Sequence, residues 1–265
     1  MPSIAAHYYF GQEILKKINR DNSEIGEFIH NYRAVFNLGL QGPDLLFYYK
    51  PYMNNKINVL GEEIHFRPAR DLVDSAAVNI RQEKSNAALG YLMGLACHFV
   101  LDSGLHGEIT QYAPDIREHL LLEAEMDRQI IEGNYSSKPH TFNRYQLVKS
   151  TNKKWDFLKL VYPQIEARHL KECVNSMGFY LMILFCRWDI KKKLLEFAEG
   201  LSGKKGPFTA LIVDSKENKH FQPYAKKLCC DMKDMVSDGL LAVENIYETT
   251  RYNAPLNCMF NRNFG

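Results

Sequence analysis

The chain has 265 residues, of which 46% are hydrophobic and 24% are charged, and its formal net charge is +2. A chain of this size can bury a sizeable core, and its composition is that of an ordinary soluble globular protein. The small net charge argues against a polycation that binds nucleic acid through charge alone. The longest apolar run, Met177–Cys186, is too short to span a bilayer.

The cysteines and the first residues of the chain indicate the cellular compartment in which the protein is expected. The six cysteines show no C-x-x-C spacing, so we expect reduced thiols. The opening stretch MPSIAAHYYFGQEILKK has no basic segment leading into an apolar run, as a secretory signal would. We therefore expect a cytoplasmic protein.

Apolar residues at helical spacing predict helices at the start of the chain. They cover Ile4–Ile18, with His7 in its opening turns, and Ser23–Leu38. The stretch GLQGPDLLFYYK follows, in which Pro43 and Asp44 suit a first helical turn because exposed N–H groups there favour an anion. Taken alone, Asp44 is explained as a helix-start acid.

The next part of the chain alternates predicted loops with predicted helices. Its prolines, its asparagines and Gly61 predict a loop over Lys50–Pro68, which contains His65. Helices are predicted over Asp71–Arg81 and Ser85–Val100. The second of them is apolar and rich in small residues, which favours a central, tightly packed position.

A turn or loop and a further helix are predicted beyond this central helix. Glycine and proline signals predict the turn over Ser103–Asp115, and this turn contains His106. The helix over Ile116–Glu132 then carries His119 and Glu123 on one face.

The C-terminal half offers fewer motifs. Its predicted segments are, in order, a polar, turn-like stretch (Asn134–Ser150), two helices (Trp155–Val161 and Gln164–Phe197), a non-helical stretch (Gly200–Pro223) and a last helix (Pro223–Tyr252). Met177–Trp188 is apolar on every side and should be buried, and the short run TALIV could pair as an edge strand. No repeat or linker composition appears. We therefore predict one almost all-α domain over residues 1–265.

Two pairs of a histidine and an acid stand four residues apart: His98 with Asp102, and His119 with Glu123, with His106 between them. Residues four apart share a helix face, and imidazole with carboxylate is a donor set that zinc favours. We expect Asp102 at the C-terminal end of its helix, where exposed carbonyls disfavour an unpaired carboxylate. Each pair alone is more often a solvated pair or a satisfied core histidine than a metal site. Both pairs lie among apolar residues, where a bound cation would supply the missing counter-charge.

The order of these candidates resembles the zinc-dependent phospholipase C family, whose fold is shared by the S1/P1 nucleases. The resemblance rests on HFVLD, the following His106, HLLLE and QGPD, with His7 near the start. It implies an all-α, multi-helix domain with a zinc cluster between the helices. The ligand sets that it implies are Asp44, His65, His98 and Asp102 for one zinc, His106, His119 and Glu123 for a second, and Asp102 with His7 for a third.

The resemblance also implies an activity. It suggests a zinc-dependent phosphodiester hydrolase of the phospholipase C type with two or three zinc ions, in which metal-bound hydroxide attacks the phosphorus of a phospholipid. Asp44 is the candidate for orienting or deprotonating the attacking water. The expected partners are a phospholipid or another phosphodiester and, transiently, a membrane surface, with no stable nucleic-acid partner. Aromatic residues near the ligands could line a substrate pocket, although at helical spacing a core position is the better explanation for most of them. The pocket candidates are Tyr8, Phe47, Tyr48 and Phe66.

Two alternatives stay open at this point. The first is a nuclease or nucleotidase of the S1/P1 type on the same scaffold, although no basic stripe with interleaved aromatics is visible. The second is an intracellular relative that binds metal without catalysis, whose fold would be sensitive to chelators.

Overall fold

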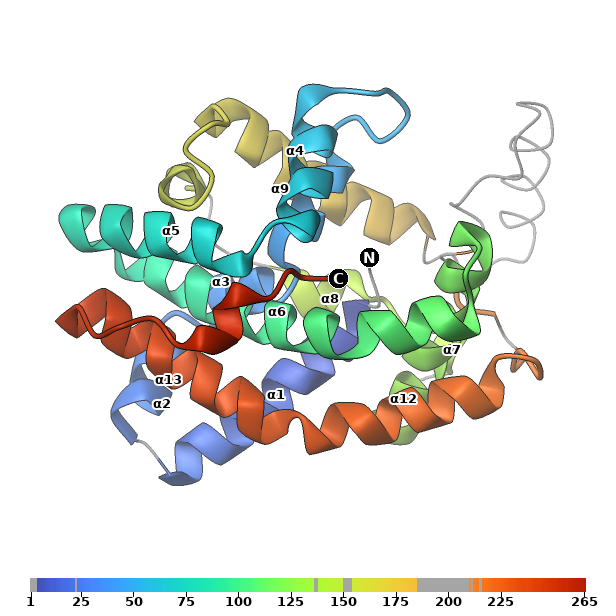
Figure 1. The fold of residues 1–265 in the computed structure, drawn as a ribbon. Helices are drawn as coiled ribbons and strands as arrows, with labels where there is room; N and C mark the ends of the chain where they lie inside the picture. The colour runs from blue at the N-terminus through green and yellow to red at the C-terminus, as the bar shows by residue number, and fades with distance from the viewer. Residues whose placement is uncertain are drawn as a thin grey trace.

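The computed structural model describes residues 4–184 and 210–265, apart from residues 22, 136–137, 150–153, 211 and 215. All secondary structure in this part of the chain is helical (Figure 1), which confirms the predicted all-α class. The helices, with η for the 3-10 type, are α1 (Ile4–Asp21), α2 (Ser23–Asn31), α3 (Arg33–Gly39), η1 (Gly42–Tyr48), α4 (Lys56–Phe66), α5 (Ala69–Glu83), α6 (Asn86–Tyr112), α7 (Ile116–Asn134), η2 (Pro139–Thr141), α8 (Tyr145–Val148), η3 (Asp156–Leu160), α9 (Ala167–Leu184), α12 (Gln222–Asp234), α13 (Val236–Tyr252) and η4 (Cys258–Asn261).

Helix α6 runs through the middle of the molecule (Figure 1). It begins after Ser85, whose hydroxyl accepts a hydrogen bond from the N–H of Ala88 at 3.3 Å. A Cβ atom at Gly94 would collide with the carbonyl of Phe36, so this glycine lets α3 approach α6 backbone to backbone. By length and composition α6 could cross a membrane, but 83% of its apolar window is buried inside the fold. Its apolar character is therefore explained by its central position.

The other helices pack around α6. Helices α12 and α13 lie along one side in Figure 1, where α12 contacts α7 and α13 contacts α6 and α1. Helices α4 and α9 lie towards the opposite side and both pack on η1. A single hydrophobic core joins buried residues from Ile4 to Phe264. This arrangement brings the N-terminal helix, η1, α4 and the C-terminal segment to the same stretch of α6.

The predicted loop over Lys50–Pro68 is wrong, because most of it forms α4. Asn55 is the N-cap of this helix, and its side-chain oxygen accepts two N–H groups of the first turn at 3.0 Å. Gly61 serves close packing, since a Cβ atom there would lie 3.2 Å from the side chain of Leu46 in η1. Asparagine and glycine are also common in loops. In this protein Asn55 caps the start of α4, and Gly61 allows α4 to pack closely on η1.

The predicted turn over Ser103–Asp115 is also wrong, because α6 continues through most of it. A Cβ atom at Gly104 would collide with the side chain of Met235, so the glycine permits a close helix contact. Consequently His106 lies on α6, two turns after His98. Asp102 lies inside the helix and not at its C-terminal end, so exposed carbonyls do not explain its environment.

Smaller differences concern helix boundaries. The predicted helix over Ser23–Leu38 is divided at Tyr32 into α2 and α3, and the last predicted helix is divided at Met235 into α12 and α13. The helix over Ile116–Glu132 is confirmed as α7. The polar stretch Asn134–Ser150 contains the short helices η2 and α8.

Helix α9 is amphipathic where the structure describes it. Met177 and Leu181 are buried, but Phe179 and Met182 are about half exposed, at 53% and 50%. The expectation that Met177–Trp188 is buried on every side is therefore wrong for its first part. Residues 185–209, and with them the end of the helix predicted over Gln164–Phe197, lie outside the described residues. The described residues of TALIV are in no strand.

Candidate metal centre

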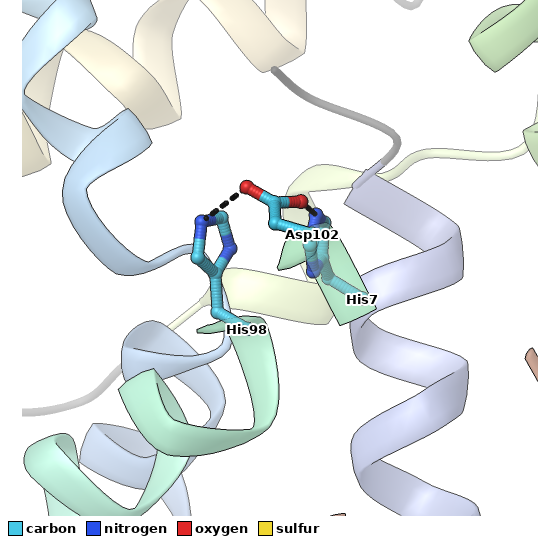
Figure 2. Close-up of side chains that lie close together, drawn as sticks. All are labelled: His7, His98 and Asp102. Atoms are coloured by element: carbon cyan, nitrogen blue, oxygen red, sulfur yellow. Dashed lines mark ion pairs between the residues drawn. The ribbon is translucent and has the colours of Figure 1, made fainter. Parts of the chain in front are cut away.

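Donor side chains from four elements converge beside the middle of α6. Asp102 lies at their centre: its Oδ1 is 3.2 Å from His7 Nε2, and its Oδ2 is 3.0 Å from His98 Nε2 (Figure 2). Its Oδ2 is also 3.9 Å from His65 Nε2 on α4. His65 Nε2 in turn lies 3.1 Å from Asp44 Oδ1 on η1. The five side chains thus form a continuous cluster around one carboxylate.

The cluster is buried. His98 is fully buried, Asp44 and His7 are 2% and 3% exposed, and the side chain of Asp102 is 14% exposed. Two triads each bring three donor atoms within 4.8 Å of one another: His7, His98 and Asp102, and Asp44, His65 and His98. Removing ionisable groups from water is expensive unless opposite charge or hydrogen bonds compensate it.

Backbone hydrogen bonds set the orientation of two of these imidazoles. His98 Nδ1 lies 3.2 Å from the carbonyl oxygen of Leu40, and His65 Nδ1 lies 2.7 Å from that of Gly61. A carbonyl only accepts, so each Nδ1 carries a proton, and in the neutral imidazole each Nε2 presents a lone pair to the cluster. Both Nε2 atoms are buried and lack a hydrogen-bond partner in the described structure. A lone pair on Nε2 and a carboxylate oxygen about 3 Å away could bind the same cation. A histidine that binds metal usually donates its other ring N–H, here Nδ1–H, to a carbonyl or carboxylate oxygen.

The protonation states of His98 and Asp44 agree with this arrangement, whereas burial acts to lower the pKa of His65 but the carboxylates of Asp44 and Asp102 outweigh it and raise the value. Burial lowers the pKa of His98, which favours the neutral imidazole that binds metal. Burial acts to raise the pKa of Asp44, but neighbouring positive charge and the close approach of His65 outweigh it and hold the value at about 2. A neutral imidazole next to ionised carboxylates is the donor chemistry that zinc prefers. The residues present therefore fit a zinc site.

A second group of donors lies between α6 and α7. His119 Nε2 is 3.3 Å from Glu123 Oε1 on α7, and the ring of His106 on α6 is 5.5 Å from that of His119. Burial and the neighbouring His119 lower the pKa of His106. A pocket of about 20 Å³, enough for roughly one water molecule or ion, connects the two groups. Its polar lining consists of His7, Asp102, His106 and Glu123.

A comparison with protein families decides the assignment. The family model described as zinc dependent phospholipase C matches residues 6–174, which is more than half of the chain. The chain belongs to this family. No curated protein and no solved structure matches this zinc-dependent phospholipase C family member. The matched region contains all eight predicted ligands, and the description of the family makes zinc the cofactor.

The structure brings the predicted ligands into two neighbouring groups, and their individual roles stay predictions. The aromatic pocket candidates lie in different surroundings. Phe47 stacks on His65 with ring centroids 5.5 Å apart, and Tyr48 approaches Tyr180 at 6.5 Å. Tyr8 packs against the core, whereas Phe66 is 69% exposed. The small pocket between the metal ligands has other lining residues, so a substrate role for these aromatics also stays a prediction.

Asp127 supports the centre and was not found from the sequence. Its Oδ1 accepts the backbone N–H groups of Ala5 and Ala6, both at 3.0 Å, and its Oδ2 accepts from Arg144 Nη1 at 2.9 Å. A carboxylate on the first N–H groups caps α1 and opposes the positive end of its dipole. Asp127 thereby fixes the start of the helix that delivers His7. A signal existed, since Asp127 lies one further turn along α7 from Glu123.

Gly42 is the second residue that sequence reasoning missed. Its φ angle is +50°, in the left-handed region that favours glycine, and a Cβ atom there would collide with the ring of His98. Replacing Gly42 with Ala is expected to lower the free energy of unfolding by about 1–3 kcal/mol and to weaken zinc binding, because the ring must move. Denaturant unfolding and zinc titration measure the two effects.

Gly107 supplies the matched control for this substitution. It lies inside α6, and a Cβ atom there would have no neighbour within 4 Å. Gly107→Ala is expected to keep zinc affinity unchanged and to raise stability by about 0.4–1 kcal/mol, through the lower entropy of the unfolded chain. Equal zinc affinities for the two alanine variants would contradict a role of Gly42 in seating His98.

Proposed function

We propose that the protein is a zinc-dependent phosphodiester hydrolase of the phospholipase C type, which cleaves the bond between glycerol and phosphate in a phospholipid. The observation that carries the proposal is the buried cluster of three imidazoles and two carboxylates around Asp102, inside the region that matches the family. Donor clusters of this kind support hydrolysis at phosphorus, because closely spaced cations can stabilise both the attacking and the leaving oxygen.

The proposal assigns two or three zinc ions to the ligands. Asp44, His65, His98 and Asp102 would hold the first, and Asp102 would share a further ion with His7. The donors of α6 and α7, His106, His119 and Glu123, would hold another. When bound, zinc would acidify a coordinated water and polarise the phosphoryl oxygens.

The chain's own residues would prepare this reaction in separate ways. Both oxygens of Asp102 face imidazoles, so this carboxylate would hold the two halves of the cluster in register. Asp44 is 2% exposed and stays ionised, so it can accept a hydrogen bond from the attacking water and orient it. Phe47, which stacks on His65, and the exposed Phe66, which follows His65 in the chain, would offer apolar contact to acyl chains, and a membrane surface would then lie at the same end.

The test uses the full chain loaded with zinc and supplied with phospholipid vesicles of several head groups. We expect release of the phosphorylated head group by the wild type and loss of this release in His98→Ala. The same preparations are tested on single-stranded DNA and on a 3′-nucleotide. A wild type that releases no head group from any lipid, and that behaves like His98→Ala, would overturn the proposal.

The other outcomes identify the alternatives. Digestion of DNA or of the nucleotide, lost in Glu123→Ala, would assign an activity of the nuclease type. A protein whose melting temperature falls with chelator, but which hydrolyses no phosphodiester, would be a metal-binding relative without catalysis.

A further inference from the structure

The C-terminal segment reaches the metal centre, although it lies far outside the matched region, which ends at residue 174. After η4 the chain runs along the junction of α4 and α5 (Figure 1). There the carbonyl of Arg262 accepts the N–H of Ala69 at 2.8 Å, and the N–H of Phe264 donates to the carbonyl of His65 at 3.1 Å. The segment is therefore held on both sides of the turn that follows His65.

The hydrogen bond from Phe264 acts on the last turn of α4. The carbonyl groups in the last turn of a helix have no partner within the helix and need one from elsewhere. His65 is the penultimate residue of α4, so its carbonyl is one of these groups. The backbone of Phe264 supplies the missing donor at the residue whose side chain belongs to the donor cluster.

The ring of Phe264 acts on the same cluster. The side chain is fully buried, and its ring centroid lies 5.6 Å from that of His65 and 6.0 Å from that of His98. It also packs edge-on against Phe99 at 5.3 Å, which fixes its own position. Phe47 stacks on His65 as well, so the imidazole of His65 contacts two aromatic rings, those of Phe264 and Phe47. One side chain thus contacts two candidate ligands that come from two different helices.

We propose that Phe264 is a positioning residue of the metal centre: its ring and its N–H hold His65 and His98 in the orientation in which both Nε2 atoms face the carboxylates. The inference rests on the proposed function, because it assumes that the cluster binds zinc. Side chains that lock the rotamers of ligands lower the cost of ordering them when metal binds. Phe264 makes no contact with the reacting atoms in this assignment.

The test compares Phe264→Ala with Phe260→Ala. Phe260 is equally buried in the same segment and stacks on Phe99 at 5.1 Å, but in the described structure its ring contacts neither His65 nor His98. Both alanine variants are expected to lower the melting temperature of the metal-free protein, because each removes a buried aromatic ring. Zn²⁺ affinity is measured by competition with a chromophoric chelator, and Co²⁺ binding by its visible absorption.

We expect Phe264→Ala to weaken Zn²⁺ binding by about 10–100-fold, as the loss of residues that support ligands does, and to alter the Co²⁺ spectrum. Phe260→Ala is expected to leave both unchanged. Phe264→Leu keeps apolar volume and serves if the alanine variant does not fold, with the same direction of effect. Wild-type metal binding in both Phe264 variants, or an equal loss in Phe260→Ala, would overturn the inference alone. A wild type that binds no metal would overturn the proposed function first.

Discussion

Replacing Asp102 with Asn is expected to abolish stoichiometric zinc binding and, with it, phosphodiester hydrolysis. Each carboxylate oxygen of Asp102 faces a different imidazole nitrogen, His7 Nε2 on one side and His98 Nε2 on the other. An amide offers one acceptor oxygen, so in either orientation its NH₂ group occupies the other position, and the negative charge is lost. Loss of supporting residues alone typically costs about 10–100-fold in metal affinity, so the loss of a shared ligand should exceed about 100-fold.

Metal content and zinc titration of the purified variants measure this effect. Glu108→Gln is the matched control, because it removes one carboxylate charge from the same helix at a surface ion pair with Lys227. We expect this control to bind zinc as the wild type does, since exposed ion pairs contribute only about 0–1 kcal/mol. Wild-type zinc affinity in Asp102→Asn would show that the cluster is not the metal centre.

Replacing Asp127 with Asn is expected to cause a large loss of stability. Asp127 is fully buried, and its carboxylate receives Arg144 and the first N–H groups of α1. The amide removes the negative charge that faces the guanidinium of the buried Arg144 at 2.9 Å, and breaking a buried pair in this way costs about 3–5 kcal/mol. The start of α1 should loosen as well, so His7 would be held less firmly.

Denaturant unfolding of the metal-free protein gives the free energies for this test. The control is the double variant Asp127→Asn with Arg144→Met, in which both charges of this pair are removed. We expect it to be less destabilised than the sum of the two single variants. A loss in Asp127→Asn of only about 0–1 kcal/mol, as for an exposed pair, would contradict the role that the geometry gives to this residue.

The sequence alone predicted the helical class and the local part of the centre. A helix repeats every 3.6 residues, so two residues four apart lie on the same face. The spacing of His98 and Asp102, and of His119 and Glu123, is therefore enough to predict that each pair shares a face. The structure places each pair on one face of its helix, as expected. The same spacing would also have led to Asp127, had it been followed for one more turn.

Other features depend on contacts between segments that are distant in sequence. In the sequence Gly104 suggests a turn, whereas in the structure it lies in α6 and allows close contact with Met235. For this reason the helical position of His106 was not predicted. Asn55 and Gly61 likewise suggested a loop around His65, which entered the predicted ligand set through the family resemblance and not through its spacing. Phe264 offered no local signal, because its part in the centre exists only where the end of the chain meets α4 and α6.

The wide separation of the donors along the chain has a consequence for folding. His7, Asp44, His65 and His98 come from four elements that are joined by long stretches of sequence, and the cysteines in the described part of the chain are free. The ions assigned to these side chains, linked through Asp102, would together close three loops, as disulfides do in secreted proteins. Closing a loop removes conformations from the unfolded chain, and the gain grows only slowly with loop length. In this fold the cation would therefore serve as a removable cross-link as well as a cofactor.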